Sequence, residues 1–277
     1  MLDPGSRIPP AVTWIIAASP ARSYTEWSNV RCNVRSLIII PVYNEEAALP
    51  YVLGEVRRAA PQSDLVVVDD GSTDRSTDLA SQHPGVEIVR HDVNRGYGQS
   101  LITGFGQAVA GGYDVAVTID CDEQHEPQRI PDFLRAIGGA HIVSGSRYLD
   151  PAMPGDPPPP DRLRLNQEFV AKLRAITGYP ITDAWCGFKA YRVEALRKFV
   201  LTEPSYGMPL QVWVQAAYHG LRVIELPVAR IYKNPSRQFW GGLDDPQTRR
   251  AYYLRVLEAE VARWLPDRRA LVEDARS

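Results

Sequence analysis

Short apolar runs alternate with helix-length amphipathic stretches through the first half of the chain, and this alternation limits the fold more than any other feature. Runs of strand length lie at 36–40, 65–70, 86–89, 114–119 and 141–147, and helices are expected between them and again at 163–176. Chains with this pattern form a mostly parallel sheet joined by right-handed crossovers. The predicted fold class is therefore α/β, with a mostly parallel central sheet flanked by helices.

The second half of the chain is organised differently. Proline is dense from 149 to 160, which excludes a helix or a central strand there and predicts a loop beside the site. A strand is expected at 222–228 and a long helix at 246–265. The expected divisions are an irregular tail at 1–34, one domain at 35–245, and a C-terminal helix and tail at 246–277.

Composition excludes several classes of protein. The formal net charge of −2 over 277 residues gives no support for a nucleic-acid-binding role. No run approaches the roughly 18 apolar residues of a membrane span. The three cysteines have neither metal-ligand nor redox spacing, so we expect a reduced, cytoplasmic protein.

Polar side chains follow three of the predicted strands at the points where the strands end. The clusters are Tyr43 to Glu45, Asp69 with Asp70, and Asp120 with Asp122 and Gln124. In an open α/β sheet, ligands bind at the carboxyl ends of the strands, so the three clusters predict one site. Carboxylate oxygens suit Mg²⁺ or Mn²⁺ held partly through substrate phosphates, and we therefore expect Asp120 and Asp122 to bind such an ion.

The motifs together resemble those of the family 2 glycosyltransferases, which have the GT-A fold, and most closely the dolichyl-phosphate mannose synthase group. The motifs, which match in order and spacing across residues 36–230, are Pro41-Val42-Tyr43-Asn44-Glu45, Val68-Asp69-Asp70-Gly71-Ser72-Thr73-Asp74, Asn94-Arg95-Gly96-Tyr97-Gly98, Asp120-Cys121-Asp122-Glu123-Gln124-His125, Gly145-Ser146-Arg147-Tyr148 and Asp183-Ala184-Trp185-Cys186-Gly187-Phe188. The resemblance implies a Rossmann-like nucleotide-diphospho-sugar transferase.

The resemblance also implies roles for individual residues on the donor side. The nucleotide sugar would be bound by Pro41, Tyr43, Glu45, Val68, Asp70, Asp120 and Cys121, with Val68 and Asp70 receiving the base. Asp120, Asp122 and Gln124 would hold Mg²⁺ or Mn²⁺, which stabilises the charge on the departing nucleoside diphosphate. Arg147 would neutralise phosphate. Cys121 is expected to be a small buried side chain rather than a nucleophile.

The acceptor side is less regular. Arg162 or Arg164, at the end of the proline-rich loop, could hold an acceptor phosphate or could be a solvated helix start. The family's Gly-x-Ser-Lys ending is replaced by Asn234-Pro235-Ser236-Arg237, where Arg237 and the nearby Lys233 would serve as phosphate clamps. Asp183 separates two mechanisms: a hydroxyl acceptor needs it as general base, whereas an ionised phosphate acceptor does not.

The expected function is metal-dependent, inverting transfer of a hexose, with GDP-mannose or UDP-glucose as donor and a polyprenyl phosphate as acceptor. The alternatives are transfer to a saccharide or small-molecule hydroxyl with Asp183 as base, and a nucleotide-sugar-binding protein without turnover. The interleaved arginines and aromatic residues of 246–265 fit either a helix packed on the domain or a peripheral contact with the inner face of the membrane.

Overall fold

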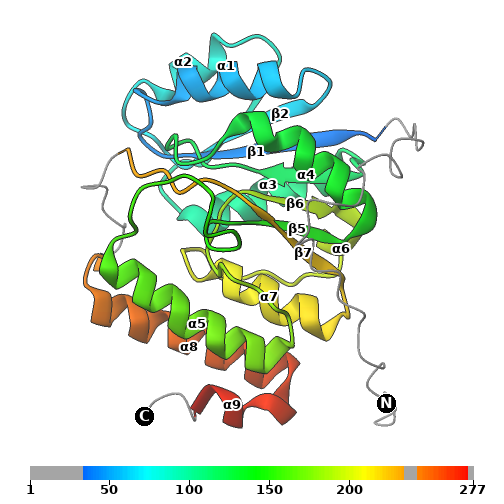
Figure 1. Ribbon diagram of the computed structural model, residues 1–277. Coiled ribbons are helices and arrows are strands. Elements are labelled where there is room, and N and C mark those ends of the chain that lie inside the picture. Colours follow the sequence, from blue (N-terminus) through cyan, green and yellow to red (C-terminus); the bar gives the residue numbers. More distant parts are fainter. Residues whose placement is uncertain (1–33, 234–241, 274–277) are drawn as a thin grey trace.

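A single seven-stranded sheet forms the centre of the described structure (Figure 1). The computed structural model describes residues 34–233 and 242–273. The strands lie in the order β3-β2-β1-β4-β6-β5-β7. Their bounds are Ser36–Val42 (β1), Asp64–Asp69 (β2), Val86–Arg90 (β3), Val115–Thr118 (β4), Ile142–Ser146 (β5), Lys189–Arg192 (β6) and Val223–Pro227 (β7).

All strand pairings are parallel except those of β6, which runs antiparallel to both β4 and β5. The mostly parallel sheet predicted from the alternation of elements is therefore confirmed. Both faces of β1 are buried: Leu37 and Ile39 belong to one apolar cluster, and Ile38 and Ile40 belong to the other. A continuous apolar strand is typical of a sheet covered by helices on both sides.

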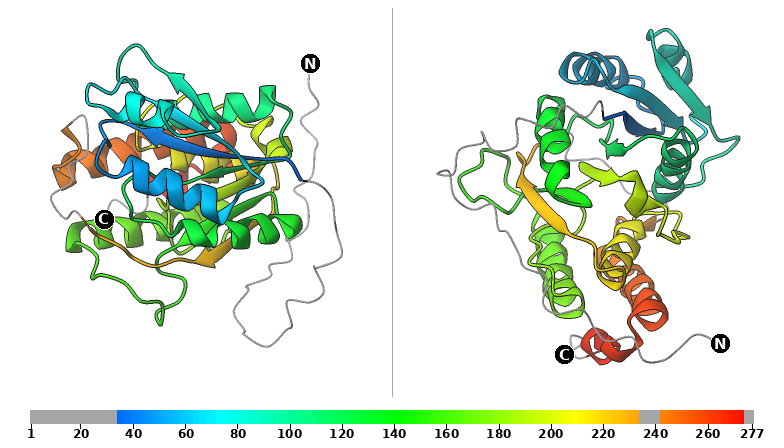
Figure 2. Two further views of the ribbon diagram at one scale, coloured as in Figure 1. Left: turned by 90° about the horizontal axis from the view of Figure 1, so that it is seen from above. Right: turned by 90° about the vertical axis from the view of Figure 1, so that its right-hand side faces the viewer.

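The helices cover the two faces of this sheet. Their bounds are Leu49–Ala59 (α1), Ser76–Ser81 (α2), Tyr97–Ala110 (α3), Ile130–Ala136 (α4), Pro160–Thr177 (α5), Val193–Leu196 (α6), Met208–Tyr218 (α7), Pro246–Trp264 (α8) and Ala270–Glu273 (α9), with 3-10 turns at Pro127–Arg129, Ile137–Gly139 and Pro266–Arg268. The views in Figures 1 and 2 place α1 and α2 on one side of the sheet and α5, α7 and α8 on the other.

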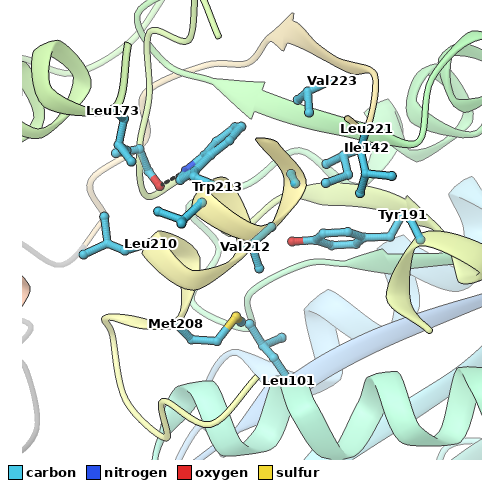
Figure 3. Packing of buried hydrophobic residues seen from close by; sticks show 14 of the residues in the cluster. Leu101, Ile142, Leu173, Tyr191, Met208, Leu210, Val212, Trp213, Leu221 and Val223 are labelled. Atoms are coloured by element: carbon cyan, nitrogen blue, oxygen red, sulfur yellow. Dashed lines mark hydrogen bonds between the residues drawn. The ribbon is translucent and has the colours of Figure 1, made fainter. Parts of the chain in front are cut away.

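The larger apolar cluster lies between the sheet and α3, α5, α7 and α8. Figure 3 shows its centre, where Trp213 of α7 packs near Leu173 of α5 and Val223 of β7. The Trp213 side chain is 1% exposed, and its Nε1 donates a 3.0 Å hydrogen bond to the carbonyl of Ala184. This bond ties the loop after α5 to the core, and that loop carries Asp183.

Helix boundaries differ from the predicted ones at a few ends. The helix expected from Glu46 begins at Leu49 as α1, with Pro50 in its first turn, where proline is tolerated. The helix expected after Pro127 begins as a 3-10 turn before continuing as α4. The long C-terminal helix is confirmed as α8, and the Asp245 carboxylate caps it by accepting from the Thr248 N–H at 2.7 Å.

Helix α8 packs on the domain through its buried residues, which include Tyr253, Leu257 and Val261. This packing agrees with the first of the two alternatives for the segment. None of the helices within the described residues is long and apolar enough to cross a membrane.

Candidate active site

A cavity of about 580 Å³ opens where β1, β2, β4 and β5 end. The residues that follow these strands line it, as the sequence predicted for the first three. Ten of the predicted site residues are among the lining residues: Pro41, Tyr43, Glu45, Asp70, Asp120, Cys121, Asp122, Gln124, Arg147 and Arg162. The donor-side cluster therefore forms one site in space.

The other predicted site residues do not line this cavity. Val68 is fully buried in the core, because it lies inside β2 rather than at its end. Arg164 is exposed beyond the cavity wall, since it faces outward from the first turns of α5. Asp183 is buried behind Arg147. Arg237 lies outside the described residues.

Lys233 is also absent from the cavity lining. Its ammonium group pairs with the Glu123 carboxylate and lies 5.4 Å from the ring centre of Tyr51 on α1. Lys233, which was predicted to bind phosphate, thus pairs instead with Glu123 of the loop that follows β4. An exposed pair of this kind contributes little to stability.

Two side chains position the Asp120 carboxylate. The Tyr97 hydroxyl donates to Oδ1 at 2.8 Å, and His125 Nε2 lies 3.1 Å from Oδ2. Burial, reinforced by the charge of Asp120, raises the pKa of Tyr97 well above its ordinary value, so the phenol keeps the proton that it donates. Neither contact was predicted, although both residues stand inside the recognised motifs. Such outer contacts orient metal-binding carboxylates.

The loop after Asp120 brings Asp122 and Gln124 to the same cavity. The Gln124 backbone N–H donates to Asp122 Oδ1 at 3.1 Å, and Glu123 adopts a left-handed conformation with φ of 57°. Asp120 and Asp122 are two positions apart and would face the same side of a continuing strand, and both line the cavity together with Gln124.

The donor set fits a hard divalent cation that is shared with a substrate. Within residues 34–233 and 242–273, no three His, Cys, Asp or Glu side chains are grouped to hold a metal by themselves. Two carboxylates, Asp120 and Asp122, and the amide of Gln124 line the cavity. Mg²⁺ is commonly held by one or two carboxylates together with substrate phosphates and water. These residues would therefore hold Mg²⁺ or Mn²⁺ only together with a diphosphate.

Gly187 lies against Asp120 and leaves room for its carboxylate. A Cβ atom at this position would be 2.2 Å from Asp120 Oδ2. We expect Gly187→Ala to displace the carboxylate and to weaken activation by Mn²⁺ about 10- to 100-fold, the range seen when the support of a metal ligand is lost. The measurement is the Mn²⁺ concentration that gives half-maximal donor turnover.

Gly106→Ala is the matched control for this substitution. No atom lies within 4 Å of a Cβ at Gly106 in α3, and alanine is favoured over glycine inside a helix by roughly 0.5–1 kcal/mol. The control should leave metal activation unchanged. Equal metal activation in Gly187→Ala and wild-type protein would contradict the placement of Asp120.

Asp70 holds a loop of the cavity. Its carboxylate accepts from the backbone N–H groups of Arg95 and Gly96, each at 2.8 Å, and lies 2.7 Å from His91 Nδ1. Asp70 is 3% exposed. Asp70 thus fixes the Asn94–Gly98 motif beside the donor cluster, and its contact with the nucleotide base stays a prediction.

Arg147 and Asp183 form a two-pronged ion pair at the end of β5. Arg147 Nε donates to Asp183 Oδ2 at 2.7 Å, and Nη2 donates to Oδ1 at 2.9 Å. The Asp183 side chain is fully buried, whereas that of Arg147 is 20% exposed and reaches the cavity. Burial alone would raise the pKa of Asp183, but the Arg147 charge and hydrogen bonds outweigh burial and lower it. Asp183 is thus a poor proton acceptor.

A second group of lining residues, which we call the cavity wall, combines aromatic rings with arginines. It includes Leu165, Asn166 and Arg162 of α5, Tyr148, Trp185, Tyr206 and Tyr232 of loops, and Arg249 and Tyr253 of α8. Arg249 was not predicted as a site residue. It is 2% exposed, pairs with Asp161 at 2.5 Å and lines the cavity.

Glu225 of β7 is a partly buried acid whose carboxylate accepts hydrogen bonds from Thr182 and Asp183. Burial raises its pKa to about 6, against the opposing effect of its hydrogen bonds to Thr182. A raised folded-state pKa means that the folded protein binds this proton more tightly than the unfolded chain does. The stabilisation from protonated Glu225 is therefore complete below the unfolded pKa of about 4.5 and is lost as pH rises through about 6.

The Glu225→Gln variant should lack this pH dependence. We expect the free energy of unfolding of the wild type, relative to that of Glu225→Gln, to fall by about 1.5 kcal/mol between pH 4.5 and 7.5, because 1 pKa unit corresponds to about 1.36 kcal/mol. Urea unfolding at the two pH values measures the difference. A constant difference would mean that Glu225 has an ordinary pKa.

Comparisons with known proteins identify the family and the fold of this chain. The family model described as Glycosyl transferase family 2 matches residues 37–200. The undecaprenyl-phosphate mannosyltransferase of Micrococcus luteus is 34% identical over 205 residues, 70% of this chain and 83% of the relative. The polyprenol monophosphomannose synthase of Mycolicibacterium smegmatis is 33% identical over 213 residues, 73% and 79% of the two chains.

Among solved structures, glucosyl-3-phosphoglycerate synthase from Mycobacterium tuberculosis matches with a TM-score of 0.67 and 20% identity over 90% of this chain and 87% of that chain, in a complex with Mn²⁺, UDP and glucosyl-3-phosphoglycerate. A Mg²⁺ and UDP complex of the same protein also has a TM-score of 0.67. At this identity the likeness shows the fold, and the predicted GT-A fold is confirmed. The chain belongs to glycosyl transferase family 2 and is a glycosyltransferase.

Proposed function

We propose that this glycosyltransferase moves a hexose from a nucleoside diphosphate sugar to a polyprenyl phosphate, with inversion and with Mg²⁺ or Mn²⁺ as cofactor. The names of the two relatives above, both at least 33% identical, support a polyprenyl-type acceptor and a mannosyl group. GDP-mannose and UDP-glucose are the donors to be tested. Because the acceptor is a membrane lipid, the proposal includes peripheral contact with the cytoplasmic face of the membrane.

The donor side follows from the residues at the ends of β1 and β4. When bound, the divalent ion would neutralise the diphosphate and stabilise the charge that develops on the departing nucleoside diphosphate. Asp120 and Asp122 would hold it, with Tyr97 and His125 fixing the Asp120 carboxylate through the contacts described above. Tyr43 and Glu45 line the same cavity and would contact the nucleotide.

The ion pair between Asp183 and Arg147 is the single observation on which the proposed phosphate acceptor rests. A hydroxyl acceptor would need a base within hydrogen-bond reach, but both oxygens of Asp183 accept from Arg147 and its pKa is lowered. The carboxylates in the cavity lining are Glu45, Asp70, Asp120 and Asp122, all at the donor strands. This arrangement supports an acceptor that arrives already ionised.

In the proposed reaction, an oxygen of the acceptor phosphate forms a bond to the anomeric carbon as the bond from that carbon to the diphosphate oxygen breaks. The nucleoside diphosphate leaves with the electron pair, and no proton has to be removed from the nucleophile. Arg147 and Arg162, which line the cavity from β5 and α5, would neutralise the acceptor phosphate, because guanidinium groups bind phosphate oxygens in pairs.

Acceptor choice tests the proposal directly. Purified protein is incubated with GDP-mannose or UDP-glucose, Mn²⁺, and either undecaprenyl phosphate or the corresponding polyprenol that lacks phosphate. We expect a glycosyl phospholipid from the phosphate alone, and no product in EDTA. Product from the polyprenol or from a saccharide, but not from the phosphate, would overturn the proposed acceptor. Donor binding without any product would support a binding protein without turnover.

A further inference from the structure

The Glu225 carboxylate accepts hydrogen bonds from several donors of one turn, and a side chain that only accepts suits this position. Its oxygens accept from the backbone N–H of Thr182 at 2.9 and 3.0 Å, from the N–H of Asp183 at 3.1 Å, and from the Thr182 hydroxyl at 2.7 Å. Every partner is a donor, and an ionised carboxylate is the side chain that only accepts. Strand β7 is thus hydrogen-bonded, through Glu225, to the turn that carries Asp183.

The same turn is held from its other side by α5. Asn166 donates through Nδ2 to the Thr182 carbonyl at 3.0 Å and accepts from the Ala184 N–H at 3.0 Å. Arg174 Nε donates to the Ile181 carbonyl at 2.7 Å. With α5 and β7 on its two sides, the turn has little freedom to shift.

This turn determines where the guanidinium of Arg147 lies. Asp183 accepts from Nε, Nη2 and the backbone N–H of Arg147. The Thr182 hydroxyl lies 2.5 Å from Ser146 Oγ, which in turn accepts from the Tyr148 N–H at 3.2 Å. The residues on both sides of Arg147 are therefore linked to the turn that Glu225 holds. Arg147 is the charged member of this network that lines the cavity.

We propose that Glu225 is a positioning residue for glycosyl transfer, which holds the Thr182–Asp183 turn so that Asp183 keeps the Arg147 guanidinium in place for the acceptor phosphate. The inference rests on the proposed function for the role of Arg147. Glu225 touches no substrate in this scheme, since it does not line the cavity. Removing the charge of Glu225 should therefore weaken binding of the acceptor phosphate and leave binding of the nucleotide sugar unchanged.

Steady-state kinetics of Glu225→Gln test whether Glu225 affects the acceptor site and not the donor site. Glutamine keeps the size of the side chain but turns one acceptor into a donor, which faces the Thr182 and Asp183 N–H groups. We expect the KM for undecaprenyl phosphate to rise about tenfold, because small displacements of a positioned group reduce reactivity strongly, and the KM for the nucleotide sugar to change less than about twofold. The matched control is Glu87→Gln on the exposed side of β3, which should change neither constant.

A double variant shows whether the effect passes through Arg147. Lysine in Arg147→Lys cannot make the two-pronged contact with Asp183, so adding Glu225→Gln to it should raise the acceptor KM by less than about twofold further. A full tenfold effect in the Arg147→Lys background would overturn the inference. If Glu225→Gln does not fold, Glu225→Asp, whose carboxylate is one methylene shorter, should raise the acceptor KM selectively.

The outcomes separate this inference from the proposed function. A lower kcat with both KM values unchanged would mean that Glu225 only supports the fold, and it would overturn the inference while the proposed function stands. Wild-type protein that forms no product with undecaprenyl phosphate would overturn the proposed function and the inference with it. A selective rise in the acceptor KM supports both.

Discussion

Asp122→Asn is expected to lower kcat/KM for glycosyl transfer by about a thousandfold. The substitution keeps the shape of the side chain but removes the charge that would bind the divalent ion. A bound metal ion stabilises a departing anion by several kcal/mol, and each 1.36 kcal/mol corresponds to a factor of about ten in rate. Asp122 is the better site for this test than Asp120, whose carboxylate also accepts from Tyr97 and contacts His125.

A second measurement on the same variant does not depend on turnover. Wild-type protein should melt at a higher temperature with GDP or UDP plus Mn²⁺ than with the nucleotide alone, because ligands that bind only the folded state stabilise it. Asp122→Asn should lose the additional rise caused by Mn²⁺. Asp267→Asn, at an exposed position after α8, is the control for loss of a negative charge. Transfer that is indifferent both to EDTA and to Asp122→Asn would refute a metal-dependent mechanism.

The donor half of the site could be predicted from sequence because each part of it is local. The apolar runs that form β1, β2 and β4 end directly at Tyr43, Asp70 and Asp120, and parallel strands bring their carboxyl ends to one edge. The positions of these residues at strand ends are therefore enough to predict that they lie close together, and no long-range contact has to be known. The cavity lining confirms this proximity.

The acceptor half could not be predicted in the same way, because its contacts join distant segments. Arg147 and Asp183 are 36 residues apart, and Arg249 and Asp161 are 88 apart. Because β6 lies between β4 and β5 and runs antiparallel to both, the loop before β6, which carries Asp183, meets the carboxyl end of β5, which Arg147 follows. Alternation of apolar and polar residues does not encode strand order, so the sequence indicates neither the Arg249–Asp161 pair nor the Arg147–Asp183 pair that decides between the two roles of Asp183.

Replacing Arg147 by methionine is expected to reduce the free energy of unfolding by about 3–5 kcal/mol, the usual effect of removing one member of a buried ion pair. Asp183 is fully buried, so its carboxylate would remain in the protein interior without its counter-charge. For a domain of this size, 1 kcal/mol shifts the melting temperature by roughly 2–4 °C, and a loss of about 10 °C is expected. Urea unfolding and thermal melts at pH 7.5 measure both quantities.

The double variant Arg147→Met with Asp183→Leu is the control for this interpretation. Apolar residues of similar volume often replace a buried ion pair with little loss of stability, so the second substitution should recover most of the stability lost in the first. Transfer activity should not recover, because the double variant lacks the guanidinium proposed to bind the acceptor phosphate. Recovery of activity together with stability would show that Arg147 serves the fold alone.

The pH dependence of stability separates the ion pair from a catalytic base at the same position. Burial raises the pKa of Asp183, but the charge and hydrogen bonds of Arg147 outweigh burial and lower it overall. The stabilisation from the ionised carboxylate is therefore present above the ordinary carboxyl pKa of about 3.9 and is lost only as pH falls through the lower folded-state value. The difference in unfolding free energy between wild type and Asp183→Asn should thus stay constant from pH 5.5 to pH 8. If Asp183 were a general base with a pKa near neutrality, this difference would change within that range. The pH profile of transfer activity would then also show a decline at acidic pH that is absent in Asp183→Asn. A constant stability difference, with no such limb attributable to Asp183, is the combination that an already ionised acceptor requires.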